Sequence, residues 1–434
     1  MLGILGFLTM LVIMILLFKS KTTPAIAFIL VPIAMALVGG FSIVDIGGFA
    51  KIGVAGTAST ATLFIFSITF FGIMSDVGMF DVIINKLVTK AGQNVIIITV
   101  LTAIIAMISH LDGSGASTFL ITIPAMLPLY KKLNIRKTTL MLICTASMGV
   151  MNLLPWGGPT MRAASVVGIE AADLWHRLIP MQVVGLVACI ALAIILGKIE
   201  IKHGAGKVVE GMNFGAEDTA AATLSEDLAK PKLLWFNIAL TLGVILTLSF
   251  VKVPTYFPFM IGVAIALIIN YPGMKNQQER MKAHASAALM MATTLLAAGV
   301  LLGVLQESGM MDSMANGMVS IIPAFMGPYI HIIIGIASAP LAILFCTDSY
   351  YYGVLPIMIS IGATFGVDPV AIAITMVVCR NCASFISPVV PATFLGCGLA
   401  EIEINEHIKY SFWWVWGISI VMLVSGIILG VITL

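Results

Sequence analysis

Charged residues are scarce in this chain. Only 10% of its 434 residues are Asp, Glu, Lys or Arg, while 60% are hydrophobic, and an ordinary soluble domain has about a quarter of its residues charged. Long apolar windows recur along the whole sequence, which is typical of helices that cross a bilayer. The composition therefore excludes a soluble globular domain and predicts an all-α, multi-pass protein of the cell membrane.

Cysteine and the common catalytic motifs are also sparse or missing. The six cysteines lie in or beside apolar segments, and Cys379 and Cys382 have helical spacing without further ligands nearby, which favours buried small residues over a zinc site or disulfide. The sequence has no nucleotide-binding loop, metal-hydrolase helix or nucleophile motif, so we expect no cofactor, no nucleic-acid partner and no enzyme. The first apolar run, residues 2–18, lacks a basic start and a cleavage site and is interpreted as a retained helix.

A polar cluster interrupts the apolar sequence at residues 109–118. It contains one aspartate, two glycines and several hydroxyl residues between apolar arms. Irregular backbone survives at membrane depth only where it is buried in protein or lines a wet cavity. We predict a re-entrant hairpin over about 94–130, although two full crossings would return the chain to the same side.

The second half of the chain resembles the first. Gly72 and Gly303 begin similar ten-residue motifs, offset by 231 residues, and the pairs Pro124/Pro356 and Pro159/Pro391 are offset by 232. We therefore predict two inverted repeats, each with five spans and one re-entrant hairpin, as in secondary transporters. The expected segments are a first repeat 1–200 with a broken span about 138–166, a linker 201–231, and a second repeat 232–434 with a hairpin about 328–365 and a broken span about 370–391. A Gly-rich connection is expected over 39–56, before a span at about 58–74.

Most of the 22 Lys and Arg residues, Lys19 among them, fall on one predicted face. The other face has only Lys51, Arg162, Arg177 and Lys252. The positive-inside rule makes the first face cytoplasmic. Both termini are then expected outside, and the linker 201–231 in the cytoplasm.

Two glycine- and proline-rich breaks interrupt predicted spans. The first leaves Gly158, Thr160 and Arg162 at the start of a new half-helix, and the second does the same for Ser384 and Thr393. A helix N-terminus carries partial positive charge and binds anions. The alternative is a pair of proline kinks whose hydroxyls satisfy freed carbonyls.

Several ionisable residues lie in apolar context. Arg380 sits inside a span, where a guanidinium costs roughly 2.5–3.5 kcal/mol on insertion scales and needs a partner or a role; a structural ion pair is the alternative. Arg162 either faces the site or snorkels at the external interface.

Asp112 and Asp348 occupy the two hairpin tips, where they carry a proton, contact a cation, or cap a helix. His110 either relays a proton or is a satisfied structural group, and Tyr350 belongs to the site or to an interfacial aromatic belt.

Two motifs, residues 111–118 and 155–163, resemble the citrate–metal:proton symporter family of the ion transporter superfamily, and the resemblance runs along essentially the whole chain. It implies a scaffold part, a transport part with two opposed hairpins, an elevator-like mechanism and a homodimer in the lipid bilayer. It also implies uptake of citrate chelated to a divalent cation together with protons. Sodium-coupled relatives have Ser-Asn-Thr at each tip, and the departure at Asp112 and Asp348 fits proton coupling.

We therefore predict a secondary transporter that imports a citrate–metal complex of the Mg²⁺ or Ca²⁺ type by proton symport, with the metal arriving as part of the substrate and no dedicated protein metal site. The expected carboxylate partners are Arg380 and Arg162. Proton coupling or contact with the substrate's metal is assigned to Asp112, Asp348 and His110. The expected substrate-binding residues are Ser114, Gly115, Ser117, Thr118, Gly158, Thr160, Arg162, Ser349, Tyr350, Arg380, Asn381, Ser384 and Thr393. The alternatives are a gluconate- or lactate-type symporter, a cation/proton antiporter, a passive channel, or a membrane enzyme that uses the two aspartates.

Overall fold

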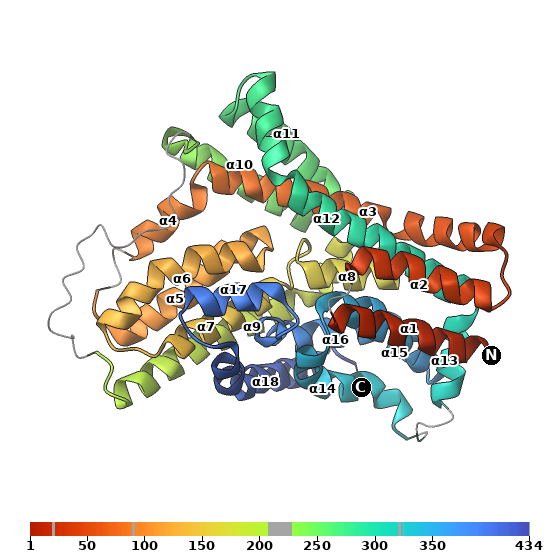
Figure 1. Cartoon of the computed structure of the whole chain (residues 1–434). Coiled ribbons are helices and arrows are strands. Elements are labelled where there is room, and N and C mark those ends of the chain that lie inside the picture. The colour runs from red at the N-terminus through yellow and green to blue at the C-terminus, as the bar shows by residue number, and fades with distance from the viewer. Residues whose placement is uncertain (20–21, 89–91, 207–227, 320–322, 324, 434) are drawn as a thin grey trace.

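The computed structural model describes residues 1–19, 22–88, 92–206, 228–319, 323 and 325–433, and within them every regular element is a helix (Figure 1). Most of the predicted linker, residues 207–227, lies outside this described part. Seven described helices are long and apolar enough to cross a membrane. The chain is therefore a multi-pass membrane protein.

The helices follow the same order in the two halves. In the first half they are α1 (Leu2–Phe18), α2 (Pro24–Val38), α3 (Ile43–Asp76), α4 (Met79–Val88), α5 (Val95–Ser109), α6 (Gly115–Lys132), α7 (Lys137–Met151), α8 (Gly158–Val167) and α9 (Ala171–Lys202). In the second half they are α10 (Leu234–Phe250), α11 (Tyr256–Asn270), α12 (Met274–Glu307), α13 (Met310–Val319), α14 (Ile330–Leu344), α15 (Leu355–Thr364), α16 (Pro369–Asn381), α17 (Pro391–Leu399) and α18 (Ile404–Ile428). Helices α3 and α12 have 34 residues each and α4 and α13 have 10 each. The two halves thus share a helical plan, and their inversion stays a prediction.

The longest helices, α3 and α12, pack against each other along a seam of small residues. A methyl group on Gly53 would collide with the backbone of Gly299 and Gly303, and one on Gly72 would collide with the ring of His284. The sequence offset of 231 maps Gly53 onto His284 and Gly72 onto Gly303. When each residue is replaced by its counterpart in the other half, the contact between Gly53 and Gly303 becomes the contact between His284 and Gly72. A two-fold relation between the halves requires such a pair of matching contacts.

This seam corrects the expected Gly-rich connection at 39–56. The helix α3 begins at Ile43, where Ser42 and Asp45 form a capping box. Glycine lowers helix propensity, but here it allows two helix backbones to approach closely. The glycines therefore mark a helix–helix contact and not a loop.

The remaining helices form two groups. Helix α2 packs on α12 and α11 packs on α3, with α1 beside α2 and α10 beside α11, whereas α5–α9 pack with α14–α18 (Figure 1). The short helices α4 and α13 follow α3 and α12 and lead toward α5 and α14, respectively. We call the first group the scaffold group and the second the hairpin group.

Two helical hairpins lie where the sequence predicts them. Helices α5 and α6 pack together, and the Thr102 hydroxyl lies 3.0 Å from the Tyr130 hydroxyl between them. Helix α14 pairs with a π-helical turn, Ser349–Val354, that continues into α15, and the Ser338 hydroxyl lies 2.7 Å from the Tyr350 hydroxyl. A hydroxyl–tyrosine contact thus joins the arms of each hairpin. Whether either hairpin re-enters the membrane stays a prediction.

Both predicted breaks are present. Helices α7 and α8 are separated by residues 152–157, and α16 and α17 by residues 382–390. The two breaks lie close together in space. Gly149, near the end of α7, packs directly on the backbone of Asn381 and Cys382 at the end of α16. The second half-helix, α17, begins at Pro391 and continues to Leu399, beyond the predicted span of about 370–391.

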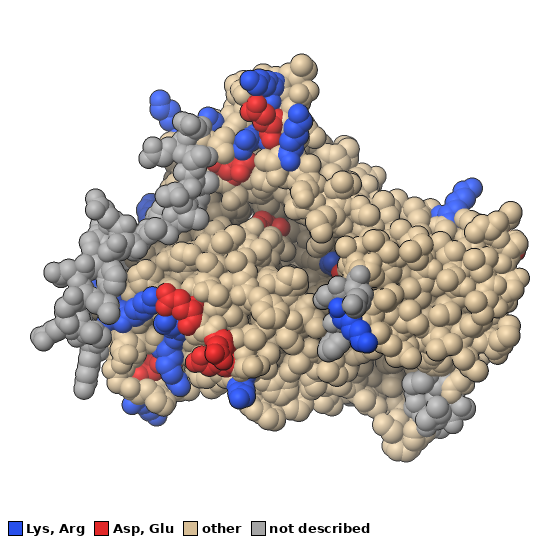
Figure 2. Space-filling model, viewed as in Figure 1, with Lys and Arg blue, Asp and Glu red and all other residues tan. Residues whose placement is uncertain are grey.

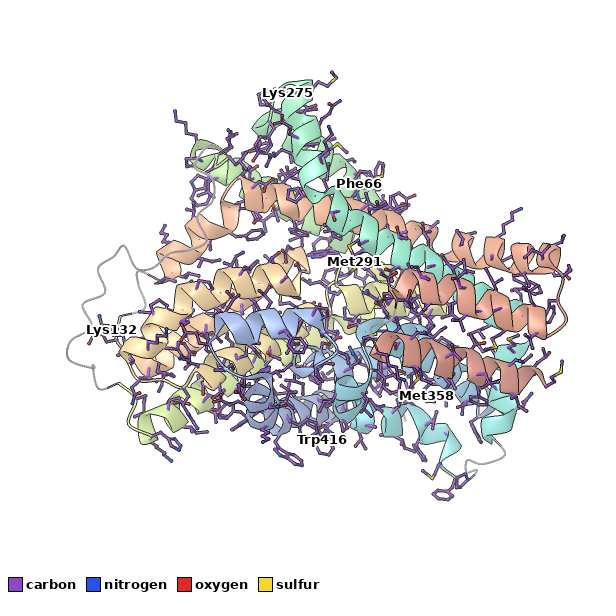
Figure 3. The ribbon with its side chains drawn as sticks, viewed as in Figure 1. Phe66, Lys132, Lys275, Met291, Met358 and Trp416 are labelled. Carbon is purple, nitrogen blue, oxygen red and sulfur yellow. The ribbon has the colours of Figure 1, made fainter. Side chains whose placement is uncertain are left out.

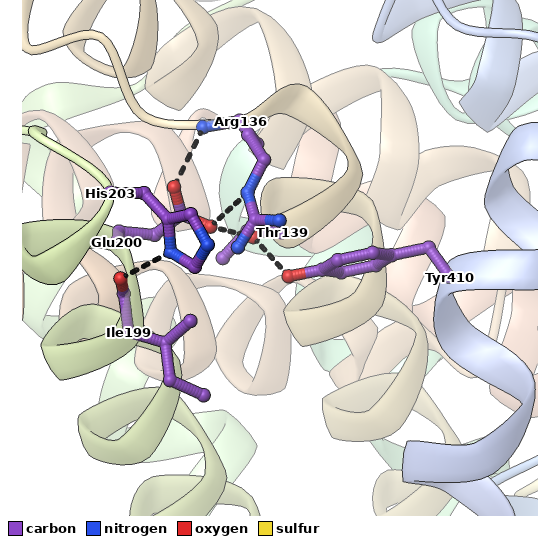
Figure 4. A network of polar contacts seen from close by, with 6 residues as sticks. All are labelled: Arg136, Thr139, Ile199, Glu200, His203 and Tyr410. Carbon is purple, nitrogen blue, oxygen red and sulfur yellow. Dashed lines mark hydrogen bonds and ion pairs between the residues drawn. The ribbon is translucent and has the colours of Figure 1, made fainter.

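A buried carboxylate fixes one end of the hairpin group (Figure 4). The Glu200 side chain, 1% exposed, accepts hydrogen bonds from Arg136 Nε at 2.8 Å and from the Thr139 hydroxyl at 2.6 Å. The Tyr410 hydroxyl lies 2.8 Å from that of Thr139. The network joins α7, α9 and α18, so these helices form one packed unit.

Candidate functional site

The described structure contains a cavity of about 850 Å³ where the two helix groups meet, a volume typical of small-molecule sites. In Figure 2 the face is hollowed at its middle, and acidic and basic atoms are visible inside the hollow. Met291 of α12, labelled near the centre of Figure 3, is one of its lining residues. The other described lining residues come from the second half of α1 and its link to α2, from α12, from Arg162, from the second hairpin tip (344–349) and from residues 389–391 at the start of α17.

An ion pair between the two halves of the chain lines this cavity. Arg162 Nε donates to Asp348 Oδ1 at 2.7 Å, and the side chains are 8% and 17% exposed. The guanidinium also lies 5.7 Å from the centre of the Phe64 ring, and Gly158 leaves room for it, since a methyl group there would lie 2.8 Å from Arg162 Nη1. Arg162 is therefore buried and paired, so the snorkelling alternative is wrong. The Asp348 carboxylate makes no helix-capping bond.

The first hairpin tip is organised around Asp112. Its carboxylate accepts a hydrogen bond from Ser114 N at 2.8 Å, across Gly113, which adopts a left-handed φ of 71°. The Ser114 hydroxyl in turn accepts from Ser117 N at the start of α6. Ser114 is therefore the residue that caps α6, and Asp112 forms a local turn that holds Ser114 in place, at a tip that remains partly exposed.

His110 is buried behind this tip. Its Nδ1 lies 2.7 Å from the Thr118 hydroxyl and its Nε2 lies 3.1 Å from Asn152 Oδ1, in the first break. The Thr160 hydroxyl donates to the Asn152 carbonyl at 2.9 Å. His110, Thr118 and Thr160 thus join the first hairpin to the first break and do not line the cavity.

The first hairpin also reaches the second break. A methyl group on Gly115 would collide with the Phe385 ring and would lie 3.3 Å from Ala392 Cβ. Ala392 is in the first turn of α17, next to Pro391, which lines the cavity. The N-terminus of α17 therefore lies between the first hairpin tip and the cavity.

Buried polar atoms without a hydrogen-bond partner gather in and beside the second break. Within the described residues they include Arg380 Nε, Asn381 Nδ2, Ser387 Oγ and Thr393 Oγ1. Such atoms are rare in folded proteins because each costs roughly 1–3 kcal/mol. Together with the N-terminus of α17, these donors suit an oxygen-rich anion.

Arg380 lies behind the second tip and does not line the cavity. Its Nη2 donates to the Phe345 carbonyl at 2.9 Å, its Nη1 to the Ser384 hydroxyl at 3.2 Å, and its guanidinium stacks 4.8 Å from the Tyr350 ring centre. Tyr350 is fully buried, so it does not belong to an interfacial belt. Arg380 thus holds the second tip against the second break.

The structure therefore brings only part of the predicted set to the cavity. Arg162, Asp348 and Ser349 line it, while Gly115 packs against the start of α17. Ser114 and Ser117 flank Gly115 at the first tip and are not among the described lining residues. Sequence reasoning missed Lys19, Thr347 and Thr294, which also line it. Lys19 and Thr294 are on the scaffold group, and no sequence pattern places that group beside the second tip. Among the described residues, no cluster of His, Cys, Asp or Glu is arranged to hold a metal ion.

Two hairpins, two broken helices and a charged cavity in a chain with seven candidate spans are typical of a membrane transporter of the secondary type, and the family and relatives given below are transporters and not enzymes. Two solved transporters share the fold: YdaH from Alcanivorax borkumensis (TM-score 0.61, 12% identity, 90% of each chain covered) and MtrF from Neisseria gonorrhoeae (TM-score 0.58, 11% identity, 88% of this chain and 83% of that one).

The sequence profile of the citrate transporter family matches residues 6–379, so the chain belongs to this family. It is similar to two Bacillus subtilis (strain 168) proteins over the full length of every chain. One, named Mg(2+)/citrate complex secondary transporter, is 39% identical over 434 residues, and the other, named citrate transporter, is 38% identical over 433 residues.

Proposed function

We propose that this protein imports citrate as a complex with one divalent cation, of the Mg²⁺ or Ca²⁺ type, together with protons. The relative at 39% identity carries the name of a Mg(2+)/citrate complex transporter. The observation that carries the proposal is the Arg162–Asp348 ion pair at the wall of the cavity.

The ion pair favours a complex over free citrate for electrostatic reasons. Citrate near neutral pH is a trianion that is expensive to desolvate, and one divalent metal lowers its charge to about −1 and governs the local electrostatics. A free trianion would compete with Asp348 for Arg162 and leave a buried carboxylate without a cation, which is strongly unfavourable. Binding of the complex breaks the Arg162–Asp348 ion pair and forms two others. A carboxylate of the complex contacts Arg162, and its metal ion contacts Asp348.

The oxygen donors near Asp348 suit a hard cation. Thr347 and Ser349, which both carry a hydroxyl, lie on the same tip and line the same cavity. Carboxylate and hydroxyl oxygens with water match the preferences of Mg²⁺ and Ca²⁺. Citrate itself supplies the other ligands, so a complete protein metal site is not required.

The test is uptake of labelled citrate by proteoliposomes with an inward proton gradient, for wild-type protein and for Asp348→Asn. Wild-type uptake should need both added Mg²⁺ and the gradient, and Asp348→Asn should lose most of the stimulation by metal. Equal stimulation of citrate uptake by Mg²⁺ in both proteins would show that Asp348 does not contact the metal of the substrate. Uptake unaffected by metal in wild type would favour a plain organic-anion symporter.

The remaining architecture is proposed on the same basis. The scaffold and hairpin groups, connected in part through the short helices α4 and α13, fit elevator-like movement of one group past the other. The symmetric contacts Gly53–Gly303 and Gly72–His284 support the inverted repeats. We further propose a homodimer with both termini outside and the linker 201–231 in the cytoplasm.

A further inference from the structure

Lys19 lies at the end of α1 and lines the cavity from the scaffold group. Among the described lining residues the charged ones are Lys19, Arg162 and Asp348. Arg162 and Asp348 neutralise each other at 2.7 Å. Lys19 is exposed, and its side chain has no hydrogen bond or ion pair with another described residue, while its backbone N–H caps α1. The described part of the wall therefore carries one uncompensated positive charge, and Lys19 provides it.

This charge complements that of the proposed substrate. A citrate–Mg²⁺ complex carries about −1 near neutral pH, whereas free citrate carries about −3. A wall of net charge +1 balances the complex and leaves free citrate with an excess of negative charge. Since Arg162 is already paired, Lys19 is the cation that acts on an arriving anion before any contact is exchanged.

Lys19 also faces the ion pair from the opposite helix group. Helix α1 packs on α2, which packs on α12 in the scaffold group, while Arg162 and Asp348 belong to the hairpin group. A ligand in the cavity then touches the ion pair on one side and experiences Lys19 on the other. An exposed lysine in a wet cavity acts through a moderate Coulomb interaction, which salt weakens.

We propose that Lys19 is a further substrate-binding residue, whose ammonium group attracts the anionic metal–citrate complex into the cavity. The inference rests on the proposed function and adds a residue to it. It requires that loss of the charge weakens binding without disturbing the fold, because the Lys19 side chain makes no hydrogen bond or ion pair with a described residue, and a substitution leaves the backbone cap of α1 in place.

The experiment is calorimetric binding of an equimolar Mg²⁺–citrate mixture to purified protein in nanodiscs, at low and high salt. Lys19→Gln should raise the Kd about tenfold at low salt, which corresponds to about 1.4 kcal/mol, and Lys19→Arg should restore it. High salt should raise the wild-type Kd and leave that of Lys19→Gln nearly unchanged. Lys252→Gln is the matched control, since Lys252 is also exposed but does not line the cavity.

The experiment distinguishes a failure of the inference about Lys19 from a failure of the proposed function. Equal Kd values for wild type and Lys19→Gln at every salt concentration would overturn the inference, while Mg²⁺-dependent binding in both would leave the proposed function intact. Wild-type binding that is as tight in EDTA as in Mg²⁺ would overturn the proposed function. In that case a weaker binding of free citrate by Lys19→Gln would still support Lys19 as the anion-attracting residue.

Discussion

Arg162 and Asp348 are 186 residues apart in the sequence, and their charged groups lie 2.7 Å apart at the wall of one cavity. One follows the break in the first half and the other occupies the hairpin tip of the second half. The pair thus joins the two halves at the place where a ligand can reach both charges.

The first prediction concerns this pair. Arg162→Gln should abolish uptake, because it removes the carboxylate partner and leaves Asp348 without a cation. Arg162→Lys should retain charge but bind at least tenfold more weakly, since an ammonium group does not offer the planar, multiple N–H donors of a guanidinium to Asp348 and to a carboxylate of the substrate together. Citrate uptake and thermal stability of each variant check this. Wild-type uptake by Arg162→Gln would exclude the pair from the site.

The second prediction separates two roles for Arg380. Because the guanidinium binds the Phe345 carbonyl and the Ser384 hydroxyl, Arg380→Ala should lower thermal stability markedly as well as uptake. Ser384→Ala removes one of these bonds and should cost about 1 kcal/mol. Thermal unfolding with and without Mg²⁺–citrate is the measurement. A stable Arg380→Ala protein that fails only to bind substrate would instead restore the direct carboxylate role.

The third prediction compares two glycines of α3. Gly53→Ala should destabilise the protein, since the new methyl group meets the backbone of α12. Gly56→Ala has open space around the added methyl group and should be neutral or stabilising by up to about 1 kcal/mol, the helix-propensity gain. Thermal unfolding of both variants in nanodiscs provides the check. Equal effects at the two positions would contradict the close seam between α3 and α12.

The fourth prediction concerns pH. Glu401, between α17 and α18, accepts hydrogen bonds from Lys131 at 2.8 Å and Lys137 at 2.6 Å. These bonds, that of Lys131 first, lower the pKa of Glu401 from 4.5 to about 2. Because the folded pKa is depressed, the stabilisation is present above about pH 4.5 and is lost as pH falls toward 2.

The stability difference between wild type and Glu401→Gln should therefore be constant near neutral pH and shrink below about pH 4.5. It should be small, since the Glu401 side chain is 51% exposed and exposed ion pairs contribute little. Glu403→Gln is the control, because the exposed Glu403 has no side-chain hydrogen bond or ion pair with another described residue. A difference that grows on acidification would have the wrong sign.

Much of the site was predictable because polar, glycine and proline residues stand out in an apolar chain. The tips at Asp112 and Asp348 and the breaks before Gly158 and Pro391 were found this way. The glycines of α3 misled the prediction, since a glycine that starts a loop and one that allows close helix packing look alike without the partner helix.

The choice between Arg162 and Arg380 could not be made from sequence. Both are arginines in apolar context, and only the three-dimensional packing shows that one lines the cavity and the other lies behind it. Lys19 was interpreted only as a sign of membrane orientation. Its place beside the second hairpin depends on contacts between segments more than 300 residues apart.

The central claim is that the transported species is the metal–citrate complex. The most direct measurement is the initial rate of labelled citrate uptake by proteoliposomes at fixed total citrate, while Mg²⁺ is increased from zero. The rate should start near zero and rise in proportion to the concentration of the complex. A rate that is maximal without metal and falls as Mg²⁺ removes free citrate would contradict the claim.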